Sequence, residues 1–195
     1  MKFYFFRHGE SIADIDDRFG GAFDDKLSLK GEEQAQELTQ KLLGKDIEML
    51  YVSPLIRTQE TATILAEYLQ CPIVTEPNLK ERDQYGFLSG MIKSEAREKY
   101  PELVEKFKDR MFAMENTESY EDFSKRIQDI FKKITSEEAR DCVGVVWHGG
   151  PMRVLFREIL KKGEIKYGDC CFVCLEKNDK GEFTVVEKDG IEFLF

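Results

Sequence analysis

Residues 2–9 read KFYFFRHG, and residues 143–150 read VGVVWHGG. Each stretch is a short apolar run, rich in aromatic or β-branched residues, that ends at a histidine and a glycine, which predicts a buried strand followed by a turn. These histidines, His8 and His148, are the two that the sequence contains. Ligands of a parallel sheet gather beyond the carboxyl ends of its strands. If the two strands are neighbours, we expect the imidazoles to lie within a few ångströms of each other at that edge.

Strand and helix patterns alternate through the rest of the chain. Apolar residues recur at helical spacing in four segments, residues 29–43, 55–69, 120–134 and 151–160. Apolar runs at residues 48–52 and 72–74 predict further strands, and the tail from about residue 170 predicts two more, joined by a turn at residues 178–181. The alternation predicts an α/β fold, in a three-layer α/β/α arrangement with a mainly parallel central sheet.

The first two helices have recognisable start signals. Ser28 is a candidate N-cap for the helix at residues 29–43, whose buried face we expect to include Leu29 and Leu43. Ser53-Pro54 is expected to open the next helix, which carries Arg57.

A single domain over residues 1–195 is expected, because this length suits one hydrophobic core. Residues 76–118 differ from the rest, since they are charged and only weakly periodic, with scattered aromatic side chains. We expect this segment to lie over the edge of the sheet as a lid, a substrate-specificity excursion or merely a surface pair of helices.

Composition and charge exclude several classes of partner. A formal net charge of −9 argues against sequence-independent binding to nucleic acid, so any phosphate site must be a local basic pocket in an acidic surface. We find no apolar stretch of membrane-spanning length and no signal-peptide pattern, and therefore expect a cytoplasmic protein without a membrane partner. The odd number of cysteines indicates reduced thiols, and Cys171 and Cys174 should point to opposite faces of a strand. The oligomeric state is left open.

Two arginines accompany the histidines. Arg7 adjoins His8, and Arg57 lies near the start of its helix. Arginine presents several hydrogen-bond donors in a planar, charged group, which suits the oxygens of a phosphoryl group. Alone, Arg57 would be read as a surface salt-bridge partner, but beside the two histidines it points to phosphate chemistry.

The motifs together resemble a known family. FYFFRHGES at residues 3–11, SPLIRTQETA at 53–62 and VVWHGG at 145–150, with DKLSLKG at 25–31 between them, are similar to the histidine phosphatase superfamily, the phosphoglycerate-mutase-like proteins. This resemblance covers nearly the whole chain in the right order. It implies an enzyme in which His8 attacks phosphorus and becomes phosphorylated, with no metal and no cofactor.

The resemblance also implies roles for other residues. Arg7, Arg57 and His148 would bind the phosphoryl oxygens in the transition state, and Glu81 would be the proton donor. The implied substrate-binding set is Arg7, Ser11, Asp14, Gly20, Gly21, Arg57, Arg82 and Gly149. Beyond the phosphate, we expect the substrate to meet side chains among Arg82, Lys93, Arg97, Tyr100, Met111 and Phe112.

Two positions depart from the family pattern. Phosphatases of this family usually have asparagine six residues after the nucleophile, and here Asp14 could pair with a cation, turn away or be protonated. The family commonly has Glu-x-x-x-Gly at the proton donor, whereas Glu81 and Gly86 are separated by one residue more. Asp83 is therefore a rival acid.

These observations favour a metal-independent phosphomonoester hydrolase that acts on a small phosphorylated substrate through a phosphohistidine intermediate. One alternative is phosphoryl transfer of the phosphoglycerate mutase type, although such mutases are generally longer. The other is a catalytically weak regulator that binds a phosphorylated ligand. A nucleotide-binding α/β domain is disfavoured, because no glycine-rich phosphate loop follows any predicted strand.

Overall fold

The two strands that end at histidines lie side by side in one six-stranded sheet. The computed structural model describes residues 1–194. Strand β1 (Lys2–Arg7) pairs in parallel with β4 (Cys142–Trp147), and Arg7 lies opposite Trp147. The residue that directly follows each of these strands is a histidine. The strand order is β3-β2-β4-β1-β5-β6.

The sheet is mainly parallel, as predicted. Strands β2 (Leu50–Val52) and β3 (Ile73–Thr75) run parallel to β4 and β1. The two tail strands, β5 (Glu164–Lys177) and β6 (Phe183–Leu194), complete the other edge in antiparallel orientation. A parallel strand needs a long crossover connection, whereas two antiparallel strands need only a turn, which accounts for this arrangement of the tail.

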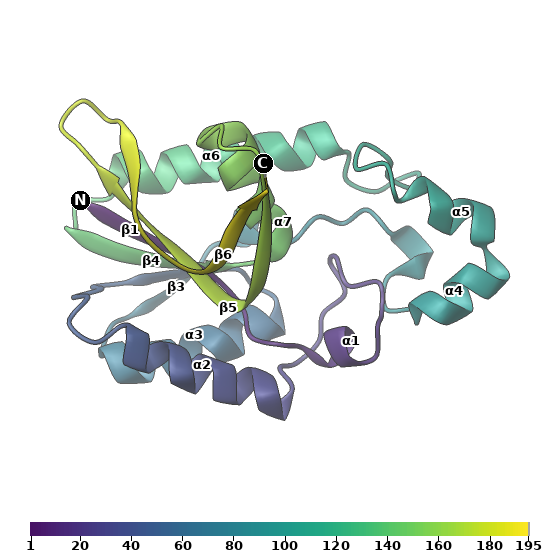
Figure 1. Cartoon of the computed structure of the whole chain (residues 1–195), viewed down its shortest axis with the longest axis horizontal. Coiled ribbons are helices and arrows are strands. Elements are labelled where there is room, and N and C mark those ends of the chain that lie inside the picture. Colours follow the sequence, from purple (N-terminus) through teal and green to yellow (C-terminus); the bar gives the residue numbers. More distant parts are fainter. Residues whose placement is uncertain (195) are drawn as a thin grey trace.

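Helices cover both faces of the sheet, which confirms the predicted three layers (Figure 1). On β1, Phe3 and Phe5 pack against α6 (Tyr120–Glu137) and α7 (Gly149–Val154), while Tyr4 and Phe6 pack against α2 (Leu29–Lys41) and α3 (Ile56–Leu69). The alternation follows from the two-residue period of a strand. Burying each of these aromatic side chains stabilises the fold by about 1.5–3 kcal/mol.

Residues 83–118 form a lobe beyond the carboxyl ends of the strands (Figure 1). It contains the 3₁₀ turn η2 (Gly86–Leu88) and the short helices α4 (Lys93–Lys99) and α5 (Pro101–Lys106), and it follows the turn η1 (Pro77–Leu79). The lobe has its own small core around Leu88 and Ala96, which Phe19 joins from the loop after α1 (Ile12–Ile15). The excursion predicted for residues 76–118 therefore begins later than expected. Residues 83–118 lie off the sheet, at the edge that carries the histidines, whereas Leu79 of η1 packs in the core beside α6.

Several element boundaries differ from those predicted. Ser28 caps α2 as expected, but Leu29 and Leu43 are 81% and 63% exposed. The reason is that α2 starts at Leu29, whose side chain points to solvent, and ends at Lys41, before Leu43. Helix α3 starts at Ile56, and its N-cap residue is Leu55, which has no side-chain acceptor. Oδ1 of Asp24 accepts from the backbone N–H of Ile56 at 2.7 Å instead.

The segment around the second histidine and the tail also departs from prediction. Helix α7 starts at Gly149 and changes at Leu155 into a π-helical turn, η3 (Leu155–Ile159). Strand β5 begins at Glu164, well before residue 170. A register shift between Tyr167 and Phe172, with Cys170 at a φ of 49°, interrupts the alternation that would have revealed the full strand.

The five cysteines are free thiols, and Cys171 and Cys174 lie in the cores on opposite faces of the sheet, as expected. Within residues 1–194, no helix is long and apolar enough to cross a membrane.

Candidate active site

His8 and His148 face each other at the carboxyl edge of the sheet. Their ring centroids are 5.2 Å apart at an interplanar angle of 62°, so the expected proximity is confirmed. The backbone N–H of His8 donates to the carbonyl oxygen of Trp147, 3.2 Å away, which ties the ends of β1 and β4 together. Both side chains are buried.

Hydrogen bonds define the tautomer of His8. Its Nδ1 lies 2.7 Å from the carbonyl oxygen of Gly9, and its Nε2 lies 3.2 Å from Nε of Arg57. A carbonyl oxygen can only accept a hydrogen bond, and a guanidinium can only donate one. Nδ1 therefore carries the proton, and Nε2 presents its lone pair to Arg57.

Burial and nearby cations keep both imidazoles neutral. Burial lowers the pKa of His8 well below its usual value, and the charges of Arg7 and Arg57 lower it further. The pKa of His148 is also well below its usual value, through burial and then through Arg57 and His8. A neutral imidazole has the free lone pair that a nucleophile needs.

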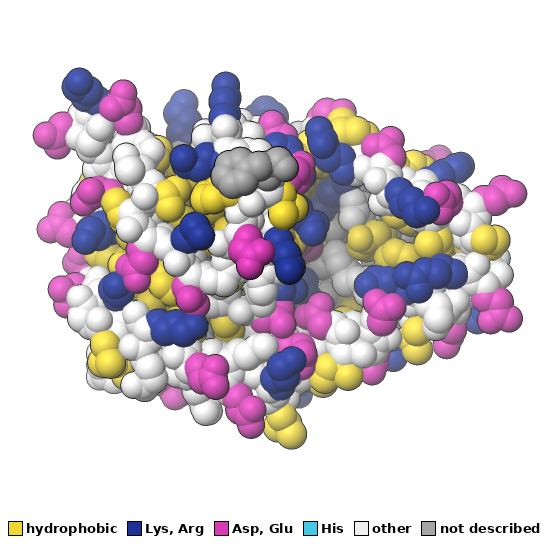
Figure 2. Space-filling view, in the orientation of Figure 1, with side chains coloured by type: hydrophobic (Ala, Val, Ile, Leu, Met, Phe, Trp, Pro, Cys, Tyr) yellow, Lys and Arg dark blue, Asp and Glu magenta, His cyan; other side chains and the backbone are white. Residues whose placement is uncertain are grey.

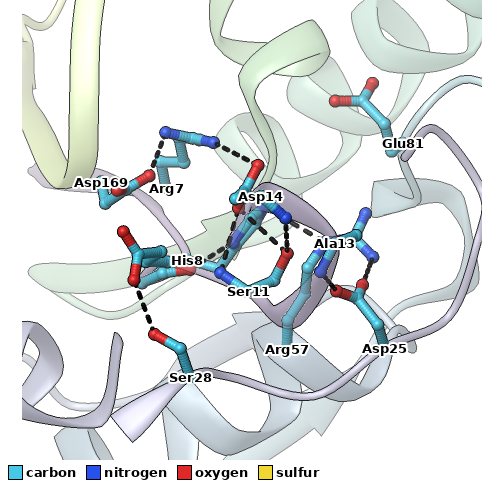
Figure 3. A network of polar contacts seen from close by, with 12 residues as sticks. Arg7, His8, Ser11, Ala13, Asp14, Asp25, Ser28, Arg57, Glu81 and Asp169 are labelled. Carbon is cyan, nitrogen blue, oxygen red and sulfur yellow. Dashed lines mark hydrogen bonds and ion pairs between the residues drawn. The ribbon is translucent and has the colours of Figure 1, made fainter. Parts of the chain in front are cut away.

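Arg57 is held from several sides in the first turn of α3. Its Nη1 donates to Oδ1 of Asp25 at 2.9 Å and to the carbonyl oxygen of Phe23 at 2.7 Å, and its Nη2 donates to the carbonyl oxygen of Gly21 at 3.0 Å. The second carboxylate oxygen of Asp25 accepts from the backbone N–H of Ala13 at 2.8 Å (Figure 3). Arg57 is thus a buried cation of fixed direction, not a surface salt-bridge partner.

Arg7 is oriented by residues of two other segments. It forms an ion pair with Asp169, in β5, and its Nη2 lies 3.8 Å from Oδ1 of Asp14 (Figure 3). Its guanidinium lies 5.4 Å from the centre of the Tyr167 ring. Nε of Arg7 is buried and has no hydrogen-bond partner among the described residues, which leaves this donor available to a ligand.

Asp14 departs from the family pattern, and both of its carboxylate oxygens have partners. Oδ2 accepts from the backbone N–H and the hydroxyl of Ser11, at 3.0 and 2.9 Å, in a capping box at the start of α1. Oδ1 faces Arg7. Of the three alternatives from the sequence, pairing with a cation is the one that the structure contains.

Glu81 lies at the site, apart from the network of Arg7 and Arg57 in Figure 3. Its Oε2 accepts from the backbone N–H of Gly150 and its Oε1 from that of Arg82, each at 2.8 Å. Any Cβ at position 150 would overlap the Glu81 carboxylate, so this approach requires glycine. The rival acid Asp83 is exposed and does not line the cavity.

These residues surround one cavity of about 590 Å³. Of the predicted site residues it is lined by Arg7, His8, Ser11, Asp14, Gly20, Gly21, Arg57, Glu81, Arg82 and Gly149, while His148 lies fully buried beside His8. Figure 2 shows the hollow between the body of the molecule and the lobe, with Lys and Arg side chains at its rim. The volume suits a small organic ligand.

Arg82 lines the cavity, and its guanidinium is bonded to backbone carbonyl oxygens. Its three guanidinium nitrogens donate to the carbonyl oxygens of Glu118, Arg110 and Phe112, at 3.1, 2.6 and 3.2 Å. Its hydrogen bonds therefore fasten the lobe to the body of the protein. Of the six residues expected to meet the rest of the substrate, Arg82 alone lines the cavity.

Other residues form the outer wall of the cavity. They include Arg18, Tyr85, Lys108, Arg110, Arg153, Arg157, Glu164 and Tyr167. Arg157 is paired with Glu164 through two hydrogen bonds, at 2.8 and 2.6 Å. Arg153 lies 5.0 Å from the centre of the Tyr167 ring and has neither an ion pair nor a hydrogen bond within residues 1–194. In a chain of net charge −9, the predicted local basic pocket is present.

The histidine phosphatase superfamily (branch 1) model matches residues 3–188. The chain belongs to this superfamily. It is 32% identical to phosphoserine phosphatase 1 of Hydrogenobacter thermophilus, over 82% of this chain and 76% of that protein. It is 33% identical to the metal-independent phosphoserine phosphatase of Arabidopsis thaliana, over 78% of this chain and 66% of that one. The fold matches that of Bacillus stearothermophilus YhfR with a TM-score of 0.85 and 24% identity, over 95% of both chains.

Four residues around the histidine phosphatase site were not found from the sequence: Asp25, Ser53, Arg153 and Asp169. Asp25 and Ser53 lie inside the quoted motifs, so their presence was visible but their partners were not. Asp169 and Arg153 have no such signal, beyond the position of Arg153 five residues after His148. The residues that the structure describes contain no cluster of three or more His, Cys, Asp or Glu side chains that could hold a metal ion.

Proposed function

We propose that this chain is a metal-independent phosphomonoester hydrolase that transfers the phosphoryl group of a small phosphorylated substrate first to Nε2 of His8 and then to water. The observation that carries the proposal is the lone pair of a neutral, buried His8 directed at Arg57. Beside it, Nε of Arg7 and Nδ1 of His148 are buried polar atoms without partners in the described chain. Buried polar atoms of this kind mark a place where a ligand supplies the missing hydrogen bonds.

In the first step, Nε–H of Arg57 leaves Nε2 of His8 and donates to a phosphoryl oxygen instead. The freed Nε2 lone pair forms a bond to phosphorus as the bond to the leaving oxygen breaks. The proton on Nδ1 stays hydrogen-bonded to the Gly9 carbonyl, which stabilises the positive charge of the phosphorylated ring. Arg7 and Arg57 stabilise the equatorial oxygens through fixed donors. The carboxyl group of Glu81 gives its proton to the leaving oxygen.

In the second step, the Glu81 carboxylate takes a proton from a water molecule, whose oxygen attacks phosphorus. The phosphorus–nitrogen bond breaks, inorganic phosphate leaves, and His8 returns to the neutral form. Glu81 is protonated again, so the cycle is balanced in atoms and protons. Ser11, Asp14, Gly20, Gly21 and Gly149 take no part in bond changes in this scheme and shape the phosphate end of the cavity.

We further propose that the substrate carries an anionic group besides its phosphate. Arg153 is a cavity cation without an ion pair or hydrogen bond among residues 1–194, and the lobe adds Lys108 and Arg110 to the cavity lining. The names of two relatives make phosphoserine, an amino acid with a carboxylate next to its phosphate ester, the first candidate. In this proposal, residues 76–118 act as the specificity segment of a single domain.

Phosphatase action is proposed over mutase action because of the open hollow in Figure 2. A mutase has to keep water away from its phosphohistidine until the group is returned to a second substrate oxygen. A cavity that opens to solvent favours transfer to water.

The test is hydrolysis of a panel of phosphomonoesters in the presence of EDTA, by the wild-type protein and by His8→Ala. The panel includes phosphoserine and phosphoethanolamine, which differ by one carboxylate. We expect the wild type to release phosphate in the presence of EDTA and His8→Ala to release none. We expect the ratio of kcat/KM for phosphoserine to that for phosphoethanolamine to fall about tenfold in Arg153→Gln, equivalent to about 1.4 kcal/mol. Absence of hydrolysis on the whole panel would favour the regulatory alternative, and isomerisation of 3-phosphoglycerate faster than its hydrolysis would favour the mutase.

A further inference from the structure

Ser53 is held rigidly at the end of β2, next to β4. Its backbone N–H donates to the carbonyl oxygen of Val146 at 3.0 Å. Its own carbonyl oxygen accepts from the hydroxyl of Thr58 at 3.0 Å and from the side-chain amide of Gln59 at 2.6 Å. Ser53 and His148 are both completely buried, so the contact between their side chains is shielded from water.

Among residues 1–194, the Ser53 hydroxyl has one acceptor within reach. Its oxygen lies 2.7 Å from Nε2 of His148. Its other contact is the backbone N–H of Leu55 at 3.4 Å, and an N–H group can only donate. A buried hydroxyl whose proton finds no acceptor costs about 1–3 kcal/mol, so the Ser53 proton points to the ring nitrogen.

This direction determines where His148 carries its proton. A ring nitrogen that accepts a hydrogen bond has no proton, and a neutral imidazole then carries its single proton on the other nitrogen. That other nitrogen, Nδ1, is buried and has no partner among residues 1–194. We propose that Ser53 is a positioning residue that holds His148 as the Nδ1–H tautomer. Its only proton then lies on the nitrogen without a partner among the described residues, next to His8, and can bind the phosphoryl group transferred there.

The inference rests on the proposed function for its catalytic consequence, but the tautomer itself is a property of the resting protein. His148 is neutral because burial, with Arg57 and His8, keeps its pKa well below the usual value. With the Nε2–H tautomer, Nδ1 would carry a lone pair and could not donate a hydrogen bond to a phosphoryl oxygen. A donor of this kind is worth about 10²–10³ in kcat when it meets charge that develops in the transition state.

The tautomer can be read directly by NMR, because the chain has two histidines. A long-range ¹H–¹⁵N correlation spectrum of the ¹⁵N-labelled protein without ligand shows which nitrogen of each ring is protonated, and His8→Gln assigns the remaining ring as His148. We expect Nδ1–H for His148 in the wild type. In Ser53→Ala we expect a shift toward Nε2–H, together with a fall in kcat of about 100-fold and little change in KM.

Thr58→Val is the matched control. It removes a neighbouring buried hydroxyl that bonds to the carbonyl oxygens of Ser53 and Leu55 but not to His148. We expect it to lower stability and to leave the His148 tautomer as it is. An Nε2–H tautomer of His148 in the wild type would overturn the proposal, and this result does not depend on whether Ser53→Ala folds. A folded Ser53→Ala that keeps the wild-type tautomer and the wild-type kcat would also overturn it. Absence of hydrolysis by the wild type counts against the proposed function alone, since the spectrum needs no turnover.

Discussion

The guanidinium of Arg57 and the carboxylate of Asp25 form an ion pair inside the protein, with Nη1 2.9 Å from Oδ1 and the side chains 5% and 7% exposed. The same carboxylate holds the backbone N–H of Ala13 in α1. One aspartate therefore fixes both the cation that faces His8 and the helix that Ser11 caps. Because both charges are buried, neither can be removed without leaving the other uncompensated.

Asp25→Asn is expected to damage stability and activity together. The amide keeps an acceptor for one hydrogen bond but leaves Arg57 without a counter-charge, so we expect the free energy of unfolding in urea to fall by about 3 kcal/mol. We also expect kcat/KM to fall more than tenfold. Asp17→Asn, which breaks the exposed ion pair of Asp17 with Lys93, is the control and should change stability by less than about 1 kcal/mol. A stable, fully active Asp25→Asn would contradict this account of Arg57.

Asp14→Asn is expected to tighten the binding of inorganic phosphate. Asparagine retains an oxygen for the capping box with Ser11 while it removes a negative charge 3.8 Å from Arg7. The Asp14 side chain is 42% exposed, so screening limits the gain, and we expect the inhibition constant for phosphate to fall by about three- to tenfold. Asp16→Asn, beside Arg18, serves as the control. An unchanged inhibition constant would remove the charge of Asp14 from the account.

Glu81→Gln and Asp83→Asn decide between the two candidate acids. Glu81 lines the cavity and Asp83 does not, so we expect Glu81→Gln to lower kcat on phosphoserine by about 10²–10⁴ and Asp83→Asn to leave it within twofold. p-Nitrophenyl phosphate has a leaving group that needs no proton, and its turnover should suffer far less in Glu81→Gln. The reverse order of the two variants would reassign the proton donor to Asp83.

The two buried histidines predict a loss of stability as the pH falls below about 6.5, the usual histidine pKa. Their pKa values are lowered in the folded protein, so just below pH 6.5 the unfolded chain binds protons that the folded one does not. The free energy of unfolding then falls by up to about 1.4 kcal/mol per histidine per pH unit until the folded-state pKa is reached. Urea unfolding at pH 7.5, 6.5 and 5.5 measures this slope. In the double variant His8→Gln, His148→Gln, the free energy of unfolding should depend less on pH over the same range. A slope equal to that of the wild type would show that other groups are responsible.

The sequence predicted the features of the site that depend on local pattern. His8 and His148 could be placed because each follows an apolar strand, and parallel strands share one ligand edge. The partners of the arginines could not be placed. Asp25 and Arg57 are 32 residues apart, and Arg7 and Asp169 are 162 apart, and no periodicity relates such side chains. These contacts are set by how loops cross the end of the sheet.

The lobe shows a second limit of sequence reasoning. Chemical type alone makes Arg82 a candidate to contact the substrate. Its guanidinium nitrogens instead donate to the carbonyl oxygens of Arg110, Phe112 and Glu118. Arg153, on α7, lines the cavity without an ion pair or hydrogen bond in the described part of the chain, and no sequence pattern indicates this. Which cation faces the cavity depends on which backbone carbonyls and carboxylates lie near each arginine, and that follows from tertiary packing.

Trapping the phosphorylated enzyme tests directly whether His8 is the nucleophile. The protein is mixed with phosphoserine labelled in its phosphate, or with whichever panel substrate is hydrolysed fastest, and quenched in base, where a phosphoramidate survives and an acyl phosphate does not. We expect acid-labile label that peptide mass spectrometry places on His8 and that His8→Gln does not acquire. Label on any other residue, or wild-type turnover by His8→Gln, would contradict it.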